Sequence, residues 1–222
     1  MHKQYSDHLT IEEAAKGIQA AIANASSLLR DAQILFDSQR YERACALAIL
    51  AIEETGKPAI LRALLLEKDS SQIRKEWKNY RSHTKKNVHY ILPTLVSQGA
   101  RHLEDFRAIF DKHSDHASTL EYLKQLALYT DSLGECQWSE PAKVVDRDLS
   151  KKVLNIAKLL VSKDHAMTSE LELELWVKHL KPVWKKDMVQ MKQALANCYQ
   201  EAEDKKVLQG NQKASDMIDF LF

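Results

Sequence analysis

The sequence predicts an all-α protein: one helical bundle with an additional helical extension at its C-terminal end. Glycine and proline are scarce, 5 and 4 in 222 residues, which is too few for the many turns of an all-β or doubly wound α/β fold. Apolar residues recur at intervals of three and four, the spacing that lines one face of a helix. With 45% hydrophobic and 28% charged residues, the chain can also bury a core.

The first two helices are predicted from a cap and from apolar stripes. Thr10 and Glu13 form a capping box, and an apolar stripe follows them as far as Phe36. A second helix is expected over residues 40–66. Its segment 44–52 is apolar on every side, so it belongs at the centre of the bundle.

The middle of the chain is expected to hold shorter elements. A third helix begins at the serine pair 70–71, carries an apolar stripe to about residue 95, and is bent or ended by Pro93. Helices follow over 101–112 and 116–128. Residues 128–141 contain a glycine, a proline and several turn formers, which predicts an ordered irregular loop.

Two long helical segments complete the chain. One is expected over residues 144–162. Ser169 and Glu172 form a second capping box that begins a last long helix, kinked at Pro182 and running to about residue 205. The tail, residues 215–222, is apolar enough to pack against another element.

We expect two parts separated near a polar break at residues 163–165. Residues 1–165 form the main helical domain. Residues 166–222 form the C-terminal extension, which packs on the same core or on a second subunit.

Charge, thiols and the longest apolar run limit the class of protein. With 32 Lys and Arg against 31 Asp and Glu, the net charge of +1 excludes a uniformly basic nucleic-acid coat. The three cysteines are widely spaced, which favours free thiols in a reducing cytosol. No signal-like segment is present at the start, and the longest apolar run, 44–52, is far shorter than the ~20 residues that span a bilayer. We therefore expect a cytoplasmic protein without a membrane partner.

Two carboxylates interrupt the second helix where charge is least expected. Glu53 and Glu54 directly follow the apolar run, and an unpaired carboxylate there would cost several kcal/mol. Glu53 is expected to pair with Lys57 four residues later, and Glu54 to point at a neighbouring helix. Gly56 allows close approach of another backbone or a ligand, and Pro58 should kink the helix. A purely structural ion pair explains this pattern equally well.

A basic segment supplies cations for these carboxylates. Residues 74–87 carry six Lys or Arg and one Glu, interleaved with aromatics, a composition that suits RNA; a solvated basic face with core aromatics is the alternative. On a continuous helix His83, Lys86 and Asn87 share one face. We expect this face to meet the second helix at Glu53, Glu54 and Lys57.

Three elements of the chain, in order, give it a resemblance to a known family. They are an E-E-x-G-K element (Glu53, Glu54, Gly56, Lys57), an aromatic-R-x-H-x-x-K element (Tyr80, Arg81, His83, Lys86), and an L-Y-x-D…W-x-x-P element (Leu128, Tyr129, Asp131, Trp138, Pro141). Over roughly residues 24–157 the chain resembles the AbiV family of abortive-infection proteins.

The resemblance implies a HEPN-like helical domain over residues 1–165, a homodimer and a role in phage defence. It implies arrest of host growth or translation, and we expect a phage-encoded activator and an RNA or ribosome-associated target. It also implies ordered polar groups at Tyr129 and Asp131.

A ribonuclease and a purely structural helical adaptor are the alternative functions. HEPN ribonucleases carry an R-x(4–6)-H motif, and its match here is Arg107 and His113, although chance alone gives about one such match in a chain of this composition. In an enzyme, His83 or His113 would act as acid and base. Arg81 or Arg107, with Lys86, would stabilise the phosphorane charge.

No metal and no cofactor are expected. His113 and His116 are three residues apart, but no H-E-x-x-H motif or distant third ligand accompanies them. The five glycines are scattered, so no phosphate-binding loop is formed, and no G-x-S-x-G motif is present.

Overall fold

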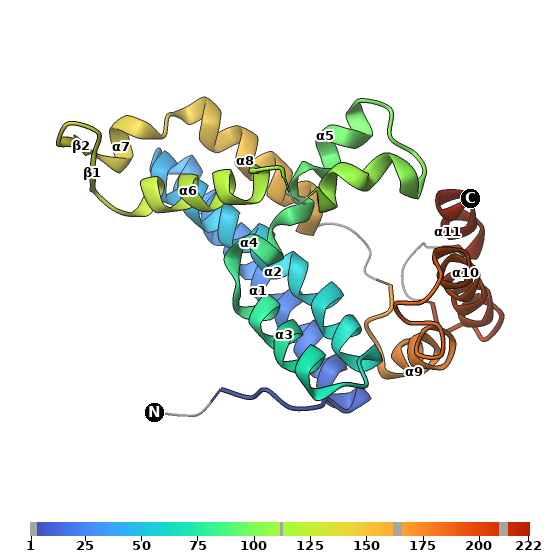
Figure 1. Ribbon diagram of the computed structural model, residues 1–222. Coiled ribbons are helices and arrows are strands. Elements are labelled where there is room, and N and C mark those ends of the chain that lie inside the picture. The colour runs from blue at the N-terminus through green and yellow to red at the C-terminus, as the bar shows by residue number, and fades with distance from the viewer. Residues whose placement is uncertain (1–3, 112, 162–165, 209–212) are drawn as a thin grey trace.

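The computed structural model describes residues 4–111, 113–161, 166–208 and 213–222 (Figure 1). Within them the fold is helical except for one β-hairpin, which confirms the all-α prediction. The elements are α1 (Ile11–Asp37), α2 (Tyr41–Leu66), α3 (Ser70–Arg81), α4 (His83–Lys86), η1 (Val88–Ile91, a 3-10 helix), α5 (Leu92–Ser97), η2 (Leu103–Phe110, a 3-10 helix), α6 (His116–Leu128), β1 (Asp131–Leu133), β2 (Gln137–Ser139), α7 (Pro141–Val144), α8 (Arg147–Val161), α9 (Glu170–Leu180), α10 (Met188–Asp204) and α11 (Ala214–Leu221).

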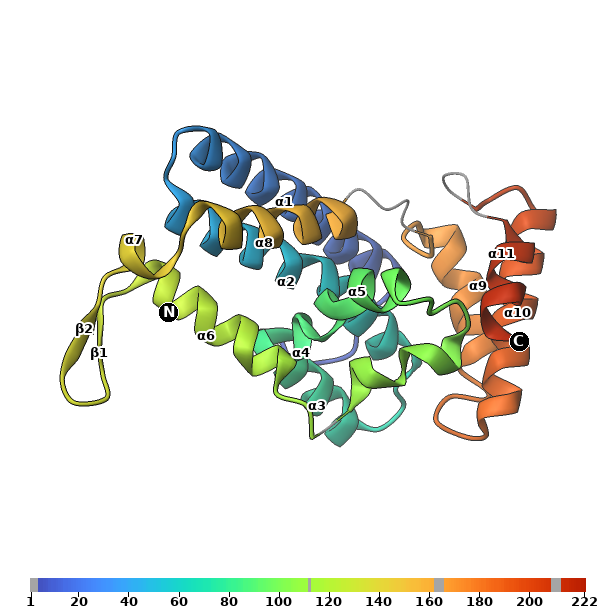
Figure 2. The same cartoon turned by 90° about the horizontal axis from the view of Figure 1, so that it is seen from above.

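Helix α2 is the central element, as its apolar sequence predicts. It contacts α1, α3, α4, α6 and α8, and Figure 2 shows α1, α2 and α8 side by side. The capping box at the start of α1 is confirmed: the Thr10 hydroxyl accepts from the Glu13 N–H at 3.1 Å, and the Glu13 carboxylate accepts from the Thr10 N–H at 2.8 Å. The α-helix α2 continues through Pro58 to its predicted end.

The third helix is shorter than predicted. It ends at Arg81 because Ser82 adopts an extended conformation, with φ −80° and ψ 127°, and the single turn α4 then starts in a new direction. The cap is Asp69 rather than the serine pair, since its carboxylate accepts from the backbone N–H groups of Ser71 and Gln72 at 2.8 and 3.1 Å. Pro93 lies in the first turn of α5, where the missing N–H has no cost.

Two further predictions for the middle of the chain are wrong in detail. Residues 103–110 form a 3-10 helix instead of an α-helix. The expected irregular loop contains an antiparallel hairpin in which Asp131 pairs with Ser139. Gly134 and Cys136 take positive φ values of 51° and 62° in its turn, a local geometry that periodicity does not reveal.

The predicted last long helix is two helices. The Ser169–Glu172 capping box starts α9 as expected, but α9 ends at Leu180 and Pro182 lies in the turn that follows. Asp187 caps α10 by accepting from the Gln190 N–H at 3.1 Å. The apolar tail forms α11, which packs against α10.

Three apolar clusters hold the described helices together. The first lies between α1, α2, α6 and α8, and the second between α1, α2, α3 and α9. The third joins the extension to Leu66 at the end of α2. Among the described residues, no helix combines the length and apolar character needed to cross a membrane.

Candidate functional site

Glu53 is the centre of a buried ionic cluster. Only 2% of its side chain is exposed, and its two oxygens face cations from two other helices. Oε1 accepts a hydrogen bond from Lys124 Nζ at 2.8 Å, and Oε2 lies 2.6 Å from His83 Nδ1 and 3.7 Å from Lys86 Nζ. The cluster therefore joins α2, α4 and α6 through one carboxylate.

Lys124 is a cluster member that the sequence motifs do not predict. It is buried on α6, and its ammonium also binds the carboxylate of Glu121 at 2.6 Å. The signal that points to it is its position: Leu120 and Ala127, four residues before and three after, are both buried on the same helix. A lysine in such an apolar stripe requires a buried anionic partner.

Gly56 explains how α4 comes close enough to α2 to reach Glu53. A Cβ atom at this position would lie 1.9 Å from the Lys86 carbonyl oxygen. Only a residue without a side chain permits this backbone contact. The glycine of the E-E-x-G-K element thus lies where the aromatic-R-x-H-x-x-K element, which contains His83 and Lys86, approaches α2.

The predicted pair between Glu53 and Lys57 is wrong. Lys57 instead binds Glu54, three residues earlier, at 2.6 Å, and its ammonium lies 5.2 Å from the centroid of the Tyr80 ring. The cations that bind Glu53 lie on α4 and α6, whereas Lys57 lies over the Tyr80 ring of α3. The two carboxylates of the element therefore serve different contacts.

His83 is the exposed member of the cluster. Half of its side chain is accessible, although its partner Glu53 is buried. Since a carboxylate only accepts hydrogen bonds, Nδ1 carries the shared hydrogen, and Nε2 forms no hydrogen bond with any residue that the structure describes. A fixed imidazole with an available nitrogen can bind a phosphate or exchange a proton.

Burial and charge shift two pKa values in the cluster. Burial lowers the pKa of the Lys86 ammonium, and the opposing attraction of Glu53 only partly offsets this. Burial acts to raise the pKa of Glu121, but the hydrogen bonds from Lys124 and Gln125 outweigh it, so the net shift is downward. Glu121 thus stays anionic beside Lys124.

Arg81 and Asn87 occupy positions next to the cluster without joining it. The Arg81 guanidinium donates to the carbonyl oxygens of Trp77 and Tyr5 and lies over the Trp77 ring, 5.3 Å from its centroid. Asn87 is fully buried, and its Nδ2 donates to the Ala117 carbonyl at 3.2 Å. Both residues fix the segment that carries His83.

The remaining candidate residues lie elsewhere on the surface. Arg107 is exposed and pairs with Glu104 at 2.5 Å, while the backbone of His113 donates to Asp111 at 2.9 Å. Tyr129 is 60% exposed at the end of α6, and Asp131 is exposed on β1. None of these four contacts the described residues of the ionic cluster.

Glu53, His83 and Glu121 also have the spacing of metal ligands, with ligand atoms within 4.8 Å of one another. The Lys124 ammonium, however, lies 2.8 Å from Glu53 and 2.6 Å from Glu121, so a lysine already supplies the positive charge between the two carboxylates. A divalent ion would have to displace this ammonium and would also face Lys86. The two carboxylates are therefore better suited to bind the Lys124 ammonium than a metal ion.

The comparisons with known proteins identify the family. The family model described as AbiV, a HEPN family, matches residues 13–162, which include every member of the ionic cluster and exclude α9–α11. Searches of curated proteins and of solved structures found no match. Because the match spans well over half of the chain and the bundle is all-α, this chain belongs to the AbiV family and has a HEPN-like fold.

Proposed function

We propose that this protein is a cytoplasmic abortive-infection protein that arrests host growth when a phage-encoded protein triggers it. In this proposal it acts as a homodimer and binds RNA of the translation machinery. Membership of the AbiV family supports the role in defence. The observation that carries the RNA part is His83, a half-exposed imidazole held by a buried carboxylate beside an uncompensated basic surface.

That basic surface consists of four exposed side chains on α3 and α4. None of the four forms a salt bridge with another described residue, so they are available to neutralise phosphates; they are Arg74, Lys75, Lys78 and Lys85. The interleaved aromatics are not available for base stacking: Trp77 is buried in the second core cluster, and Tyr80 packs against it. Phosphate contacts therefore supply the affinity in this proposal.

RNA binding is tested by removing charge from this surface. The double substitution Lys78→Gln and Lys85→Gln should weaken RNA binding, and the slope of log K against log salt should fall by about 1.4, roughly 0.7 for each phosphate contact on a single strand. Fluorescence anisotropy at several salt concentrations measures both. The matched control is Lys151→Gln and Lys158→Gln on the exposed side of α8.

The same variants distinguish binding from a purely structural role in cells. Growth arrest after infection should be lost in the α3–α4 double variant and kept in the α8 variant. Equal arrest by both variants, with both folded, would show that the protein acts as a structural adaptor instead. Failure of the wild type to bind RNA would refute the proposed target.

A metal-independent ribonuclease is the second candidate, and the geometry of His83 and Glu53 specifically favours it. A carboxylate bonded at Nδ1 orients an imidazole for proton transfer at Nε2, as in other acid–base sites. The residues proposed to stabilise a phosphorane give less support, because Arg81 is turned to Trp77 and Lys86 is buried against Glu53.

Incubation of the purified protein with cellular RNA, with and without EDTA, tests this candidate. Cleavage that survives EDTA and disappears in His83→Ala would establish the enzyme, provided that circular dichroism shows a folded variant. The Arg107→Ala and His113→Ala variants serve as comparisons, since neither residue contacts the cluster. Undiminished cleavage by His83→Ala would exclude His83 as the acid–base residue.

A further inference from the structure

One face of α2 borders a hollow next to the ionic cluster, whose member Lys86 is among the lining residues. The hollow has a volume of about 480 Å³, within the range of small-molecule sites. Its floor is formed by the small residues Gly56, Ala59 and Ala63, and its opposite wall by Leu103 and Phe106 of η2. Ala59 is exposed although α2 is the central helix, so this face is open to a ligand.

The C-terminal extension completes the wall of this hollow. Phe220 of α11 lines it, and the ring of Phe106 lies 5.7 Å from the Phe220 ring. His102 Nδ1 lies 2.9 Å from the Asp219 carbonyl oxygen, which holds α11 beside η2. The extension, which lies outside the residues matched by the family model, therefore contributes directly to the cavity.

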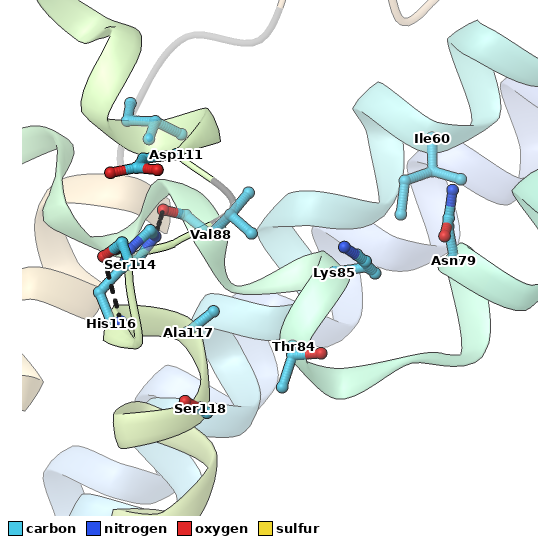
Figure 3. A pocket seen from close by; sticks show the side chains of 11 residues that line it. Ile60, Asn79, Thr84, Lys85, Val88, Asp111, Ser114, His116, Ala117 and Ser118 are labelled. Carbon is cyan, nitrogen blue, oxygen red and sulfur yellow. Dashed lines mark hydrogen bonds between the residues drawn. The ribbon is translucent and has the colours of Figure 1, made fainter.

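A second hollow of about 540 Å³, whose lining is shown in Figure 3, adjoins the first and has more polar residues in its lining. The two share Lys85, which lies in Figure 3 between Asn79 on one side and His116 on the other. Of the described charged residues, Lys85 is the one that lines both hollows, and it forms no salt bridge with any of them. Glu76, at the rim of the apolar hollow, accepts a hydrogen bond from Asn79 at 3.0 Å.

We propose that the two hollows together bind a small amphipathic acid. Its apolar chain or ring system lies over the glycine and alanine floor against Phe106 and Phe220, and its carboxylate lies beside the Lys85 ammonium. The apolar walls favour a hydrocarbon body, and the exposed ammonium at the junction favours an anionic head. The proposal shares Lys85 with the basic surface, but the apolar floor and Phe220 do not belong to that surface. Phe220→Ala therefore tests the binding of the acid separately from the binding of RNA.

Isothermal titration calorimetry with decanoate as the probe tests this site. Wild-type protein should bind decanoate saturably with one molecule per chain, and Lys85→Gln should weaken binding by roughly fivefold, the value of an exposed ion pair. Decanol, which has the same chain without the charge, should bind wild type and Lys85→Gln equally. Lys158→Gln on α8 is the matched control and should bind as wild type does.

Two further variants test the apolar part. Ala59→Phe fills the hollow from an exposed position and should abolish decanoate binding, whereas Phe220→Ala removes part of the wall and should weaken it. Thermal unfolding shows whether each variant is folded. If Ala59→Phe does not fold, decanoate binding by Phe220→Ala is the test of the apolar part. No saturable decanoate binding by wild type, undiminished binding by Phe220→Ala, or equal affinity for decyltrimethylammonium would overturn the proposal.

Discussion

Glu53 shows how one buried residue can determine the position of three helices. Its carboxylate is the common partner of His83, Lys86 and Lys124, so its loss leaves two buried ammonium groups with less compensation. Because these three partners lie on α4 and α6, the Glu53 carboxylate ties both helices to α2.

Replacing Glu53 should therefore be costly. Glu53→Gln is expected to lower the free energy of unfolding by about 3–5 kcal/mol, the typical effect of breaking a buried ion pair. Glu12→Gln is the matched control: Glu12 also pairs with a lysine, but that pair is exposed to solvent, so the loss of stability should be much smaller. Urea denaturation measures both, and equal losses would show that the cluster contributes nothing beyond a surface pair.

Gly56 tests the contact between α2 and α4. The added methyl group of Gly56→Ala would lie 1.9 Å from the Lys86 carbonyl oxygen, so one of the two backbones must move, at a cost of roughly 3 kcal/mol or more. Gly17→Ala in α1 is the comparison. Its Cβ would meet only the Leu61 side chain, whose nearer methyl group lies at 3.2 Å, and the gain in helix propensity offsets that contact to within about 1 kcal/mol.

Both glycine variants are measured by urea denaturation, and the Gly56→Ala variant also by the exposure of Lys86 to an amine-reactive reagent. We expect Lys86 to become reactive because α4 moves away from Glu53. A stable Gly56→Ala variant with unreactive Lys86 would contradict the close contact.

At the scale of elements, local caps predict two helix starts, whereas periodicity misses a helix end that depends on tertiary contact. Thr10 and Ser169 accept hydrogen bonds from their own first turns, so both starts are local and were predicted. The end of α3 at Arg81 is not local: the apolar stripe continues past it, but the backbone turns at Ser82 and brings Lys86 against Gly56. Periodicity cannot reveal a break that a tertiary contact stabilises.

Glu201 of α10 pairs with three basic side chains, two of which lie on α9, so it links the two helices. Hydrogen bonds from Lys178, Lys205 and His179 lower the pKa of Glu201 to about 2. A carboxylate with a lowered pKa stabilises the folded state above its ordinary pKa of 4.5, and that stabilisation is lost as the pH falls towards 2.

Glu201→Gln should therefore lower the Tm at pH 7, and the difference from wild type should shrink as the pH falls from 5 to 3. Thermal denaturation followed by circular dichroism measures this. Glu203→Gln is the control two residues away, with no salt bridge to any described residue. A difference that stays constant with pH would contradict the role assigned to Glu201.

At the scale of the whole molecule, the buried thiols make the fold sensitive to alkaline pH. Burial raises the pKa of Cys45 and of Cys198 to about 12, against an ordinary value of 9.0. Between pH 9 and about pH 12, these thiols lose their protons in the unfolded chain but keep them in the folded chain. Stability is therefore complete below about pH 9 and falls as the pH rises towards 12.

Each buried thiol should lower the free energy of unfolding by up to about 1.4 kcal/mol per pH unit in that window. Cys45→Ala should reduce the slope measured by urea denaturation between pH 9 and 10.5. Cys136→Ala, at the exposed hairpin turn, should leave the slope unchanged. An unchanged slope in Cys45→Ala would show that this thiol ionises alike in both states.

The sequence by itself determined the fold class, the central position of α2 and the residues Glu53, His83 and Lys86. These follow from the spacing of apolar residues, from local caps and from the cost of a charge in an apolar segment. Only the tertiary structure decided that Lys124 completes the cluster and Lys57 does not, and that Phe220 closes a hollow over α2. The physical reason is that ion pairs and cavities depend on how helices distant in the chain approach one another, and local periodicity carries no information about that approach.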